Sequence, residues 1–478
     1  MNTAVVEYLK QKGVKVINED STDRIDIWKQ WYKGHLDKFH SYKVYTGKKN
    51  ITLERLTLNM AARTAQKWAD LLLNERVTVQ CDDEYSEQRI TELLHQTNFF
   101  VRGNNLIEIA FALGGGFFIQ FWDGTKTNQK YVTQEYMYPI SFDSGRLTEA
   151  AFASSKVIDG KKYIYLETHL LDSKKEYVID NTLLYSDTQN VDSDCISGLR
   201  EVEPVFYEEH GIIPKIETHR SEPLFQMVHP NIANKMSFNS PYGTSVFAGA
   251  TDTLRAIDLI FDSYYKEFKL GKKRIFVHDG VTNINYDRDG KTYDVFDPNE
   301  EVFYRLPDSE QDSAPPIIES NLALRVAEHN TALQTQLNIL SQQVGFGSNG
   351  FKWEDGSVET ATGVISRNSE MFRTLQKHEL VLRDAVIQMC KGLLYIENVF
   401  GGDTRCNYEA AITVDFDDSI IEDTAEKKRQ ALIELQNGLI DPIQYYQDIY
   451  GMTEQQAIDF YSKMQARAPK PEEEPEGV

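Results

Sequence analysis

The sequence predicts an α+β protein made of several segments that differ in their pattern of apolar and polar residues. Between residues 117 and 186, short β-branched and aromatic runs alternate with DG, SG and DS turns, which is typical of antiparallel strands. Further along, three long stretches carry apolar residues every three or four positions, which predicts amphipathic helices. A second, smaller β-rich segment lies between the first two of these helices. Strands and helices are therefore segregated along the chain instead of alternating.

Composition limits the class of protein. The chain has 478 residues, of which 41% are hydrophobic and 11% aromatic, so it is long enough for several folded domains. Its net charge of -22 argues against a stationary clamp on DNA, because such proteins draw most of their affinity from neutralising phosphates. A protein past which DNA slides is still compatible with this charge. No apolar run is long enough to span a bilayer and the first residues lack a signal pattern, so we expect synthesis in the cytoplasm and no membrane partner.

The cysteines do not indicate a metal site or a disulfide framework. Four are widely spaced and no C-x-x-C occurs, so free thiols are expected at the following positions: Cys81, Cys195, Cys390 and Cys406.

Residues 1–239 are expected to form an α+β domain. Helices are expected over residues 28–42, 52–73, 87–94 and 104–113, the last ended by three glycines at 114–116. The strand-like runs that follow predict one antiparallel meander.

The second half begins with a long helix. Residues 240–270 carry apolar side chains at consistent helical spacing, and Gly271 follows where a helix-ending glycine belongs. Residues 272–316 predict a small β module with a hairpin turn at Asp289-Gly290. Helices over 319–344 and 359–399 follow, the latter about 60 Å long if straight at ~1.5 Å per residue. It could bend at Gly363 or Gly392. A strand over 408–416, three short helices and an acidic tail complete the chain.

A literal G-x-G-x-x-G stands between the second and third long helices, from Gly345 to Gly350. A dinucleotide-binding loop needs a strand before it and a helix starting within it. Here a helix precedes the loop and FKWEDGS follows, which favours a loop in which glycines provide backbone freedom as hinges. A cofactor-dependent enzyme using this loop remains the alternative.

Two acidic patterns are candidate ion sites. Asn285-x-Asp287-x-Asp289-Gly290 resembles the start of a calcium loop, but its twelfth position is Phe296, so a hairpin turn is favoured. Asp415, Asp417 and Asp418 lie between a strand and a helix, where capping is favoured over metal binding. We expect no metal, no cofactor and no catalytic residues, since no Ser–His–Asp, Cys–His or Walker A pattern occurs.

Two stretches resemble portal proteins of tailed bacteriophages, in the siphophage family of Gram-positive hosts. They are NSPYGTSVFAGATDTLRAIDLIFDSYYKEFKLGKKRIFV (239–277) and VGFGSNGFKWEDGSVETATGVISRN (344–368). The order of elements matches over nearly the whole chain. The resemblance implies the following parts: a wing from 1–239 with the long helix 359–410, a stem from 240–270 and 319–343, a clip from 271–318, a tunnel loop from 344–358, a crown from 411–470 and a disordered acidic tail from 471–478.

The resemblance also implies a function and a set of partners. A dodecameric ring at the capsid vertex would pass double-stranded DNA during packaging and ejection. The clip would dock the terminase large subunit and later a head-completion or adaptor protein, and the wing would meet major capsid and scaffolding proteins. Such a protein works in the host cytoplasm during assembly and then in the virion, and it does no chemistry. A helical scaffold without a channel is a third possibility.

The residues expected to act on DNA fall into two groups. The tunnel loop would place these residues in the channel: Gly345, Gly347, Ser348, Asn349, Gly350, Lys352 and Trp353. For Lys352, reaching a phosphate and being an ordinary exposed lysine are both open. A basic cluster near the clip would contact DNA or the motor, or only complement the dipole of the preceding helix. It comprises Lys269, Lys272, Lys273 and Arg274.

Overall fold

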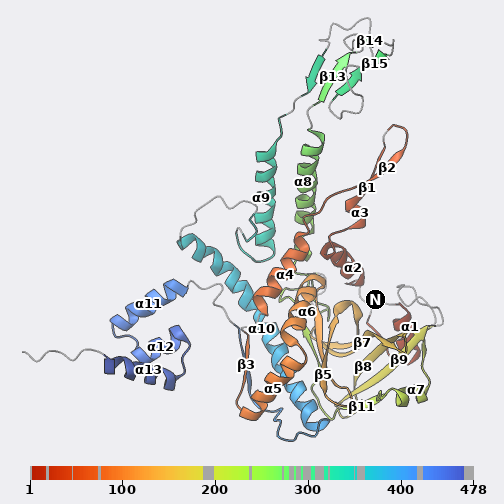
Figure 1. Cartoon of the computed structure of the whole chain (residues 1–478). Helices are drawn as coiled ribbons and strands as arrows, with labels where there is room; N and C mark the ends of the chain where they lie inside the picture. Colours follow the sequence, from red (N-terminus) through yellow and green to blue (C-terminus); the bar gives the residue numbers. More distant parts are fainter. Residues whose placement is uncertain are drawn as a thin grey trace, which may run out of the picture. The chain divides into compact units, whose positions relative to one another are not determined.

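The computed structural model describes most of the chain, and every structural statement below concerns these residues alone. They are 3–17, 21–45, 47–73, 77–186, 199–235, 239–271, 274–278, 285–286, 292–293, 303–306, 317–320, 323–348, 350–352, 361–416 and 424–467. The chain divides into two compact units. The larger unit comprises residues 1–357 and 373–416, and the smaller one residues 358–372 and 417–478. Helices and strands are both abundant, which confirms the α+β class (Figure 1).

The N-terminal segment contains three helices where the sequence predicted one over 28–42. They are α1 (Thr3–Gln11), α2 (Ser21–Tyr32) and α3 (Asp37–His40). The helix stops at Gly34, whose φ is +78°. The N–H of Gly34 donates to the carbonyl of Trp31 and that of His35 to the carbonyl of Gln30, the paired bonds of a Schellman ending. The single-helix expectation is therefore wrong, because glycine ends α2 in a left-handed conformation.

A hairpin follows, where the sequence predicted the start of a helix over 52–73. Strands β1 (Ser41–Tyr45) and β2 (Asn50–Glu54) pair antiparallel, and α4 (Met60–Leu72) starts only after them. The apolar residues of 51–53 are two positions apart, as in a strand. Over so short a segment, this spacing looks the same as the edge of a helical pattern. Strand β3 (Thr78–Cys81) comes next.

The next two helices are longer than predicted but lie where expected. Helix α5 (Glu84–Gln96) begins at Asp83, whose side chain accepts a hydrogen bond from the N–H of Ser86. Helix α6 (Phe99–Leu113) ends at Gly114, which has φ +102°. A Cβ on Gly114 would lie 2.7 Å from the carbonyl oxygen of Gly243, so glycine is required here for shape as well as for φ.

The strands form two sheets where the sequence predicted one meander. The larger sheet has the spatial order β10-β9-β8-β7-β6, with β11 also pairing with β9. Its strands are β6 (Met137–Asp143), β7 (Arg146–Ile158), β8 (Lys161–Leu171), β9 (Tyr177–Ser186), β10 (Leu199–Glu201) and β11 (Lys215–Glu217). Helix α1 packs on this sheet, and α7 (Pro204–Glu209) contributes Tyr207 to a second cluster.

The other sheet, of order β12-β4-β5, accounts for the correction. Strands β4 (Gly116–Trp122) and β5 (Thr127–Thr133) pair with each other outside the larger sheet, and β4 also pairs with β12 (Phe225–Val228), about a hundred residues later. The single turn of η1 (Gln134–Tyr136) separates β5 from the larger sheet. This long-range pairing has no local signal in the sequence.

The two long helices that follow start later than predicted. The segment 240–247 is not helical; after the turn η2 (Ala248–Ala250), α8 runs from Thr251 to Leu270. Helix α9 (Val326–Gln343) begins after strand β17 (Ile317–Ser320), which occupies the predicted helix start. Before α8, the chain buries Tyr242, Val246 and Phe247 without forming a helix. Apolar spacing alone therefore placed the start of this helix too early.

The predicted β module lies between these helices. Strand β13 (Arg274–His278) pairs with β16 (Phe303–Leu306) in parallel and with β17 antiparallel. A separate hairpin joins β14 (Asn285–Tyr286) and β15 (Thr292–Tyr293). This antiparallel pairing is what the hairpin interpretation predicts; Asp287, Asp289 and the turn itself lie outside the described residues.

Helix α10 runs from Ala361 to Val399, close to the predicted 359–399. At Gly392, a predicted bend, a Cβ would lie 2.7 Å from Oε1 of Gln120, so glycine leaves room for that side chain. Gly363, the other predicted bend, lies in the first turn of this helix. The predicted strand at 408–416 is β18 (Ile412–Asp415), which pairs with β3.

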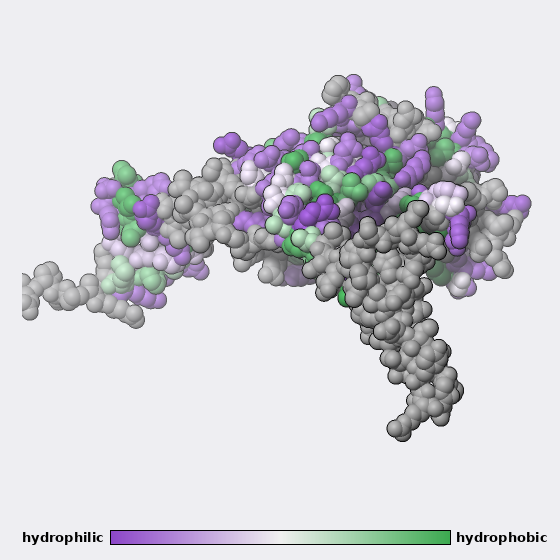
Figure 2. All heavy atoms as spheres, turned by 90° about the horizontal axis from the view of Figure 1, so that it is seen from above, coloured by the Kyte–Doolittle hydropathy of each residue, from purple (hydrophilic) through white to green (hydrophobic). Residues whose placement is uncertain are grey.

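The smaller unit contains the three predicted short helices. They are α11 (Thr424–Gln436), α12 (Pro442–Tyr450) and α13 (Glu454–Arg467). Few of its described side chains are buried, and Figure 2 shows hydrophobic residues on its surface among hydrophilic ones. None of the helices in the described part of the chain is long and apolar enough to cross a membrane.

Candidate functional site

The loop after α9 is held by an aromatic stack. The ring of Phe346 lies on the indole of Trp68 in α4, with centroids 4.5 Å apart and planes 16° apart. Both side chains are buried, and the Trp68 Nε1–H donates to the carbonyl of Val344 at 3.1 Å. His378 of α10 packs edge-on against Trp68 at 4.9 Å. The start of the loop is thus part of the core of the larger unit.

Two polar side chains fix the far end of the same loop. Ser341 Oγ donates to the carbonyl of Gly347 at 2.6 Å and accepts from the N–H of Gly350 at 2.8 Å. Lys67 Nζ donates to the carbonyl of Gly350 at 2.7 Å and lies 4.6 Å from the centre of the Phe346 ring. Hydrogen bonds and a cation–π contact therefore close the loop on itself and on α4.

The glycines of the loop serve close packing. Gly345 and Gly347 have φ values of +86° and +68°. A Cβ on Gly345 would lie 2.6 Å from Thr374 Cγ2, and one on Gly350 would lie 2.4 Å from Ser341 Oγ. The hinge interpretation is therefore corrected for the described residues: these glycines allow approach and left-handed turns within a packed structure.

The cofactor alternative finds no support in this geometry. The loop follows helix α9 instead of a strand. The Phe346 N–H donates to the carbonyl of Ser341 at 2.9 Å, and the Gly350 N–H is used by Ser341 Oγ. Because these donors are engaged inside the loop, they are not presented to a pyrophosphate.

The polar residues of the loop that the structure describes beyond Gly347 are exposed. Ser348 is exposed and accepts from Gln342 Nε2 at 3.3 Å, and the Lys352 side chain is exposed. Asn349 and Trp353 lie outside the described residues. The loop thus has a buried base at Phe346 and an exposed rim that includes Ser348 and Lys352.

Helices α8 and α9 lie side by side and run antiparallel (Figure 1). At one end, Arg325 donates to both oxygens of Glu267, at 3.1 and 2.8 Å. These hydrogen bonds lower the pKa of Glu267 to about 2. At the other end, Thr253 Oγ1 donates to Gln343 Oε1 at 2.8 Å, next to the loop. Between these two ends, α9 carries three buried leucines: Leu333, Leu337 and Leu340.

The predicted basic cluster lies where α8 gives way to the β module. Lys269 is exposed, with Nζ 6.0 Å from the centre of the Tyr265 ring, and Arg274 begins β13. Lys272 and Lys273 lie outside the described residues. The two described members therefore lie on either side of the junction between α8 and β13.

Two buried carboxylates of α8 attach this helix to other parts of the larger unit. Asp258 accepts from the Leu58 N–H at 2.8 Å, from Thr57 Oγ1 at 3.1 Å and from His40 Nε2 at 3.1 Å. His40 Nδ1 accepts from the Leu36 N–H at 2.7 Å, which leaves its proton on Nε2. Burial raises the pKa of the Asp258 carboxyl, although its donors act in the opposite direction.

One turn further along α8, Asp262 makes a second attachment. Lys266 Nζ donates to Asp262 at 2.5 Å and to Tyr42 Oη at 2.8 Å, at the base of the β1–β2 hairpin. Asp258 and Asp262 therefore tie α8 to the segment from residue 36 to 58.

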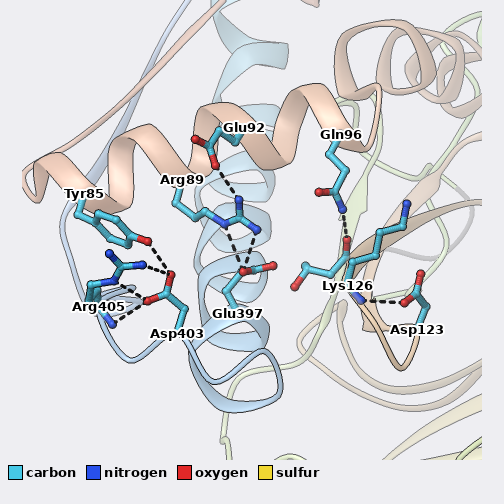
Figure 3. Close-up of polar contacts among 10 residues, drawn as sticks. Tyr85, Arg89, Glu92, Gln96, Asp123, Lys126, Glu397, Asp403 and Arg405 are labelled. Atoms are coloured by element: carbon cyan, nitrogen blue, oxygen red, sulfur yellow. Dashed lines mark hydrogen bonds and ion pairs between the residues drawn. The ribbon is translucent and has the colours of Figure 1, made fainter.

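A second polar network joins α5 to the end of α10 (Figure 3). Arg89 donates to Glu397 at 3.0 Å through Nη2 and to Glu92 at 2.6 Å through Nη1. Asp403 accepts from Tyr85 Oη at 2.6 Å and from Arg405, and these hydrogen bonds lower its pKa to about 2. Because every charged group here has a partner within the network, we interpret it as a structural connection between α5 and α10.

The acidic ion-site candidate at the end of β18 is only partly described. Asp415 is exposed and its backbone pairs with Thr78 of β3, while Asp417 and Asp418 lie outside the described residues. Among the residues that the structure covers, no group of three or more His, Cys, Asp or Glu side chains could hold a metal ion.

The residues that seat the loop were missed from the sequence. Trp68 and Lys67 lie almost 280 residues before the loop, and Ser341 is an ordinary position on α9. The only local signal was Phe346, an aromatic residue between two glycines, whose burial could have been suspected.

Two antiparallel helices carry a β module at one end and a seated glycine loop at the other, as expected for a phage portal protein. The family model described as "Phage portal protein, SPP1 Gp6-like" matches residues 12–470, so the chain belongs to that family. None of the curated proteins matches the chain.

Solved structures of gene transfer agent particles are similar in outline. A chain from the neck of a native particle computed with C12 symmetry is 11% identical, with 81% of this chain and 88% of that chain covered and a TM-score of 0.43. A chain from a virion of the native particle is 10% identical, with coverage of 95% and 99% and a TM-score of 0.46.

Proposed function

We propose that this chain forms a ring of twelve copies at one capsid vertex, through which double-stranded DNA is packaged and ejected. Family membership supports the class of protein. The observation that carries the proposal is the antiparallel α8–α9 pair, which links the β module to a loop with a buried base and an exposed rim. In such a ring the exposed rim would lie along the channel, with Ser348 and Lys352 nearest the DNA.

The parts of the subunit are proposed as follows. Residues 240–270 and 319–343 form the stem, 271–318 the clip, 344–358 the tunnel loop and 411–470 the crown. Residues 1–239 with 359–410 form the wing. The stem boundaries include the non-helical stretch 240–247 and strand β17, so the stem helices proper are α8 and α9.

Each end of the subunit has proposed partners. The clip docks the terminase large subunit during packaging and a head-completion protein afterwards. The wing meets major capsid and scaffolding proteins. The protein acts in the host cytoplasm during assembly and then in the virion. The net charge of -22 suits a channel that must not hold DNA tightly.

Ring formation is tested by negative-stain electron microscopy and native mass spectrometry of the purified protein. We expect closed rings with a central hole and a mass near twelve subunits. A particle that stays monomeric at high concentration would overturn the proposal, and filaments or dimers without a hole would favour a helical scaffold. Calorimetric binding of a dinucleotide would revive the enzyme alternative.

The channel position of the loop is tested by charge reversal. Lys352→Glu should leave rings intact and lower the amount of DNA packaged into capsids, because a carboxylate on the rim repels phosphates. Lys161→Glu, at an exposed position in β8, is the matched control. If the two variants packaged equal amounts of DNA, the proposal that Lys352 lies in the channel would be wrong.

A further inference from the structure

Helix α9 is almost free of charged residues. Nine of its eighteen residues are Asn, Gln, Ser or Thr, and Glu328 is the only Asp, Glu, Lys or Arg among them. These four charged types make up 26% of the whole chain. The neighbouring helix α8 has seven of them in twenty residues: Asp252, Arg255, Asp258, Asp262, Lys266, Glu267 and Lys269. The lack of charge is therefore a local property of α9.

One face of α9 is exposed along the whole helix. The helical period brings five exposed residues to this face, opposite the buried leucines. They are Glu328, Thr331, Thr335, Ile339 and Gln342, and we call them the α9 stripe. His329 and Gln343, which contact α8, lie on the two flanks of the leucine face. The stripe thus lies on the side of α9 away from α8.

The two threonines of the stripe keep their hydroxyl hydrogens within the helix. Thr331 Oγ1 donates to the carbonyl of Ala327 at 2.9 Å, and Thr335 Oγ1 donates to the carbonyl of Thr331 at 2.8 Å. A threonine hydroxyl has a single hydrogen, so neither side chain has a donor left for a ligand. The stripe therefore combines an absence of positive charge with a small number of available donors.

The stripe is continuous with the exposed rim of the glycine loop. Gln342 Nε2 donates to Ser348 Oγ at 3.3 Å. Gln334, beside the stripe, donates from Nε2 to the carbonyl of Phe351 at 3.1 Å, next to Lys352. Both sides of the rim thus rest on α9, which extends from the loop toward the β module (Figure 1). A duplex that passes the rim in the proposed ring therefore also passes the stripe.

We propose that the α9 stripe is the surface along which double-stranded DNA slides in the stem. The inference rests on the proposed ring. Tight binding to DNA comes from lysines and arginines that neutralise phosphates and release counterions, and the stripe has neither. Amide and hydroxyl groups contact phosphates through hydrogen bonds, which water replaces readily as the duplex moves. Repeated in every copy, the stripe touches DNA without holding it.

A neighbouring copy of the chain is the other occupant that an exposed helix face could have. The core of an interface between proteins is rich in aromatic residues, Met and Arg. The stripe contains none of these, and its single hydrophobic residue is Ile339, which is 38% exposed. Exposed aromatic residues lie on α8 instead, at Tyr265 and Phe268. Contacts between copies are therefore assigned to α8 in preference to the stripe.

The first test detects DNA at the stripe. Thr335 is replaced by the photoactivatable amino acid p-benzoylphenylalanine, and packaging into capsids is stalled with a non-hydrolysable ATP analogue before irradiation. We expect the protein to be cross-linked to DNA. The same replacement of Arg255, at an exposed position of α8, is the matched control and should give no cross-link above background. Electron microscopy confirms rings in both variants before the comparison.

The second test adds positive charge to the stripe. Thr335→Lys should slow packaging by about tenfold, and the defect should shrink as the salt concentration rises, because every lysine in the ring gains a phosphate contact. Thr335→Val keeps the shape of the side chain without the hydroxyl and should package at the wild-type rate. Thr52→Lys adds the same charge at an exposed position of β2 and should also match the wild type.

The outcomes separate this inference from the proposed function. A wild type that forms no rings or packages no DNA overturns both. If the wild type packages DNA, but position 335 gives no cross-link and Thr335→Lys packages normally, the ring stands and the sliding surface is wrong. A cross-link at position 255 alone would make α8 the channel lining. Loss of rings in Thr335→Lys would assign the stripe to contacts between copies and likewise overturn the inference.

Discussion

The indole of Trp68 and the ring of Phe346 are stacked 4.5 Å apart, although 278 positions separate them in the chain. The contact joins α4 to the loop between α9 and α10. Together with Ser341 and Lys67, it turns a glycine-rich segment into a packed one. The exposed rim of the loop is therefore presented from a fixed base.

Removing the ring of Phe346 should destabilise the larger unit. Phe346→Ala leaves a cavity beside Trp68, and we expect a loss of about 3–5 kcal/mol in the free energy of unfolding. Urea unfolding followed by circular dichroism measures it. Leu380→Ala, at a residue of α10 that is 61% exposed, is the control and should cost less than about 0.5 kcal/mol. Equal losses in the two variants would show that the stack contributes nothing.

Adding one methyl group to Gly350 should also destabilise the loop. The new Cβ would lie 2.4 Å from Ser341 Oγ and 2.6 Å from Phe346 Cβ, so these groups must shift. We expect Gly350→Ala to cost about 1–3 kcal/mol by overpacking. Gly249→Ala adds the same methyl group in open space, and its melting temperature should match the wild type. A neutral Gly350→Ala would mean that the loop is not packed as described.

Glu167 should make the protein sensitive to strong acid. It is buried against Lys130 and His169, at 2.5 and 3.1 Å. Burial opposes its ionisation, but the charge of Lys130 and the bond to His169 outweigh burial and lower the pKa of Glu167 to about 2. The stabilisation is therefore complete above about pH 4.5 and is lost as the pH falls toward 2.

Glu167→Gln tests this contribution. It leaves Lys130 without its buried partner and should cost about 3–5 kcal/mol at pH 7, with a smaller further loss between pH 4.5 and 2 than in the wild type. Urea midpoints across this range give both quantities. Glu208→Gln, at an exposed position, should follow the wild-type curve. An unchanged acid slope in Glu167→Gln would contradict the assignment.

His378 should act in a separate, higher pH window. Its ring lies between Trp68 and Phe111, and burial lowers the pKa of His378 to about 3. The unfolded chain binds a proton below about pH 6.5 while the folded chain does not. Stability should therefore be complete above pH 6.5 and fall by up to about 1.4 kcal/mol per pH unit below it.

The test measures how steeply the free energy of unfolding changes with pH between pH 6.5 and 4.5, where Glu167 stays ionised in the folded protein. His378→Gln should flatten this slope, and His95→Gln, at an exposed position of α5, should not. If His378→Gln keeps the wild-type slope, the histidine is charged in the folded state and our description of its site is wrong.

The sequence was informative where the signal is local. The long helices, the β module and the three C-terminal helices all lie close to their predicted places, because apolar periodicity and turn residues act within a few positions. Helix starts were less well predicted. Residues 242–247 bury apolar side chains without helical geometry, and β17 occupies the predicted start of α9.

Long-range features could not be predicted in this way. Strand β12 pairs with β4 across about a hundred residues of sequence, and Trp68 contacts Phe346 across almost three times that separation. The glycine loop shows the limit most clearly. Flexibility and close packing both favour glycine, and only the position of Trp68, Thr374 and Ser341 decides between them.

The burial of Trp68 gives the protein an internal optical probe. Its indole is fully enclosed, touches Phe346 and His378, and donates its only N–H to the loop backbone at Val344. Because the emission wavelength of indole depends on the polarity of its surroundings, displacement of the loop base would shift the emission of Trp68. The chain has five tryptophans, so a variant that keeps Trp68 and carries phenylalanine at the other four positions would report the seat of the loop in solution without an attached dye.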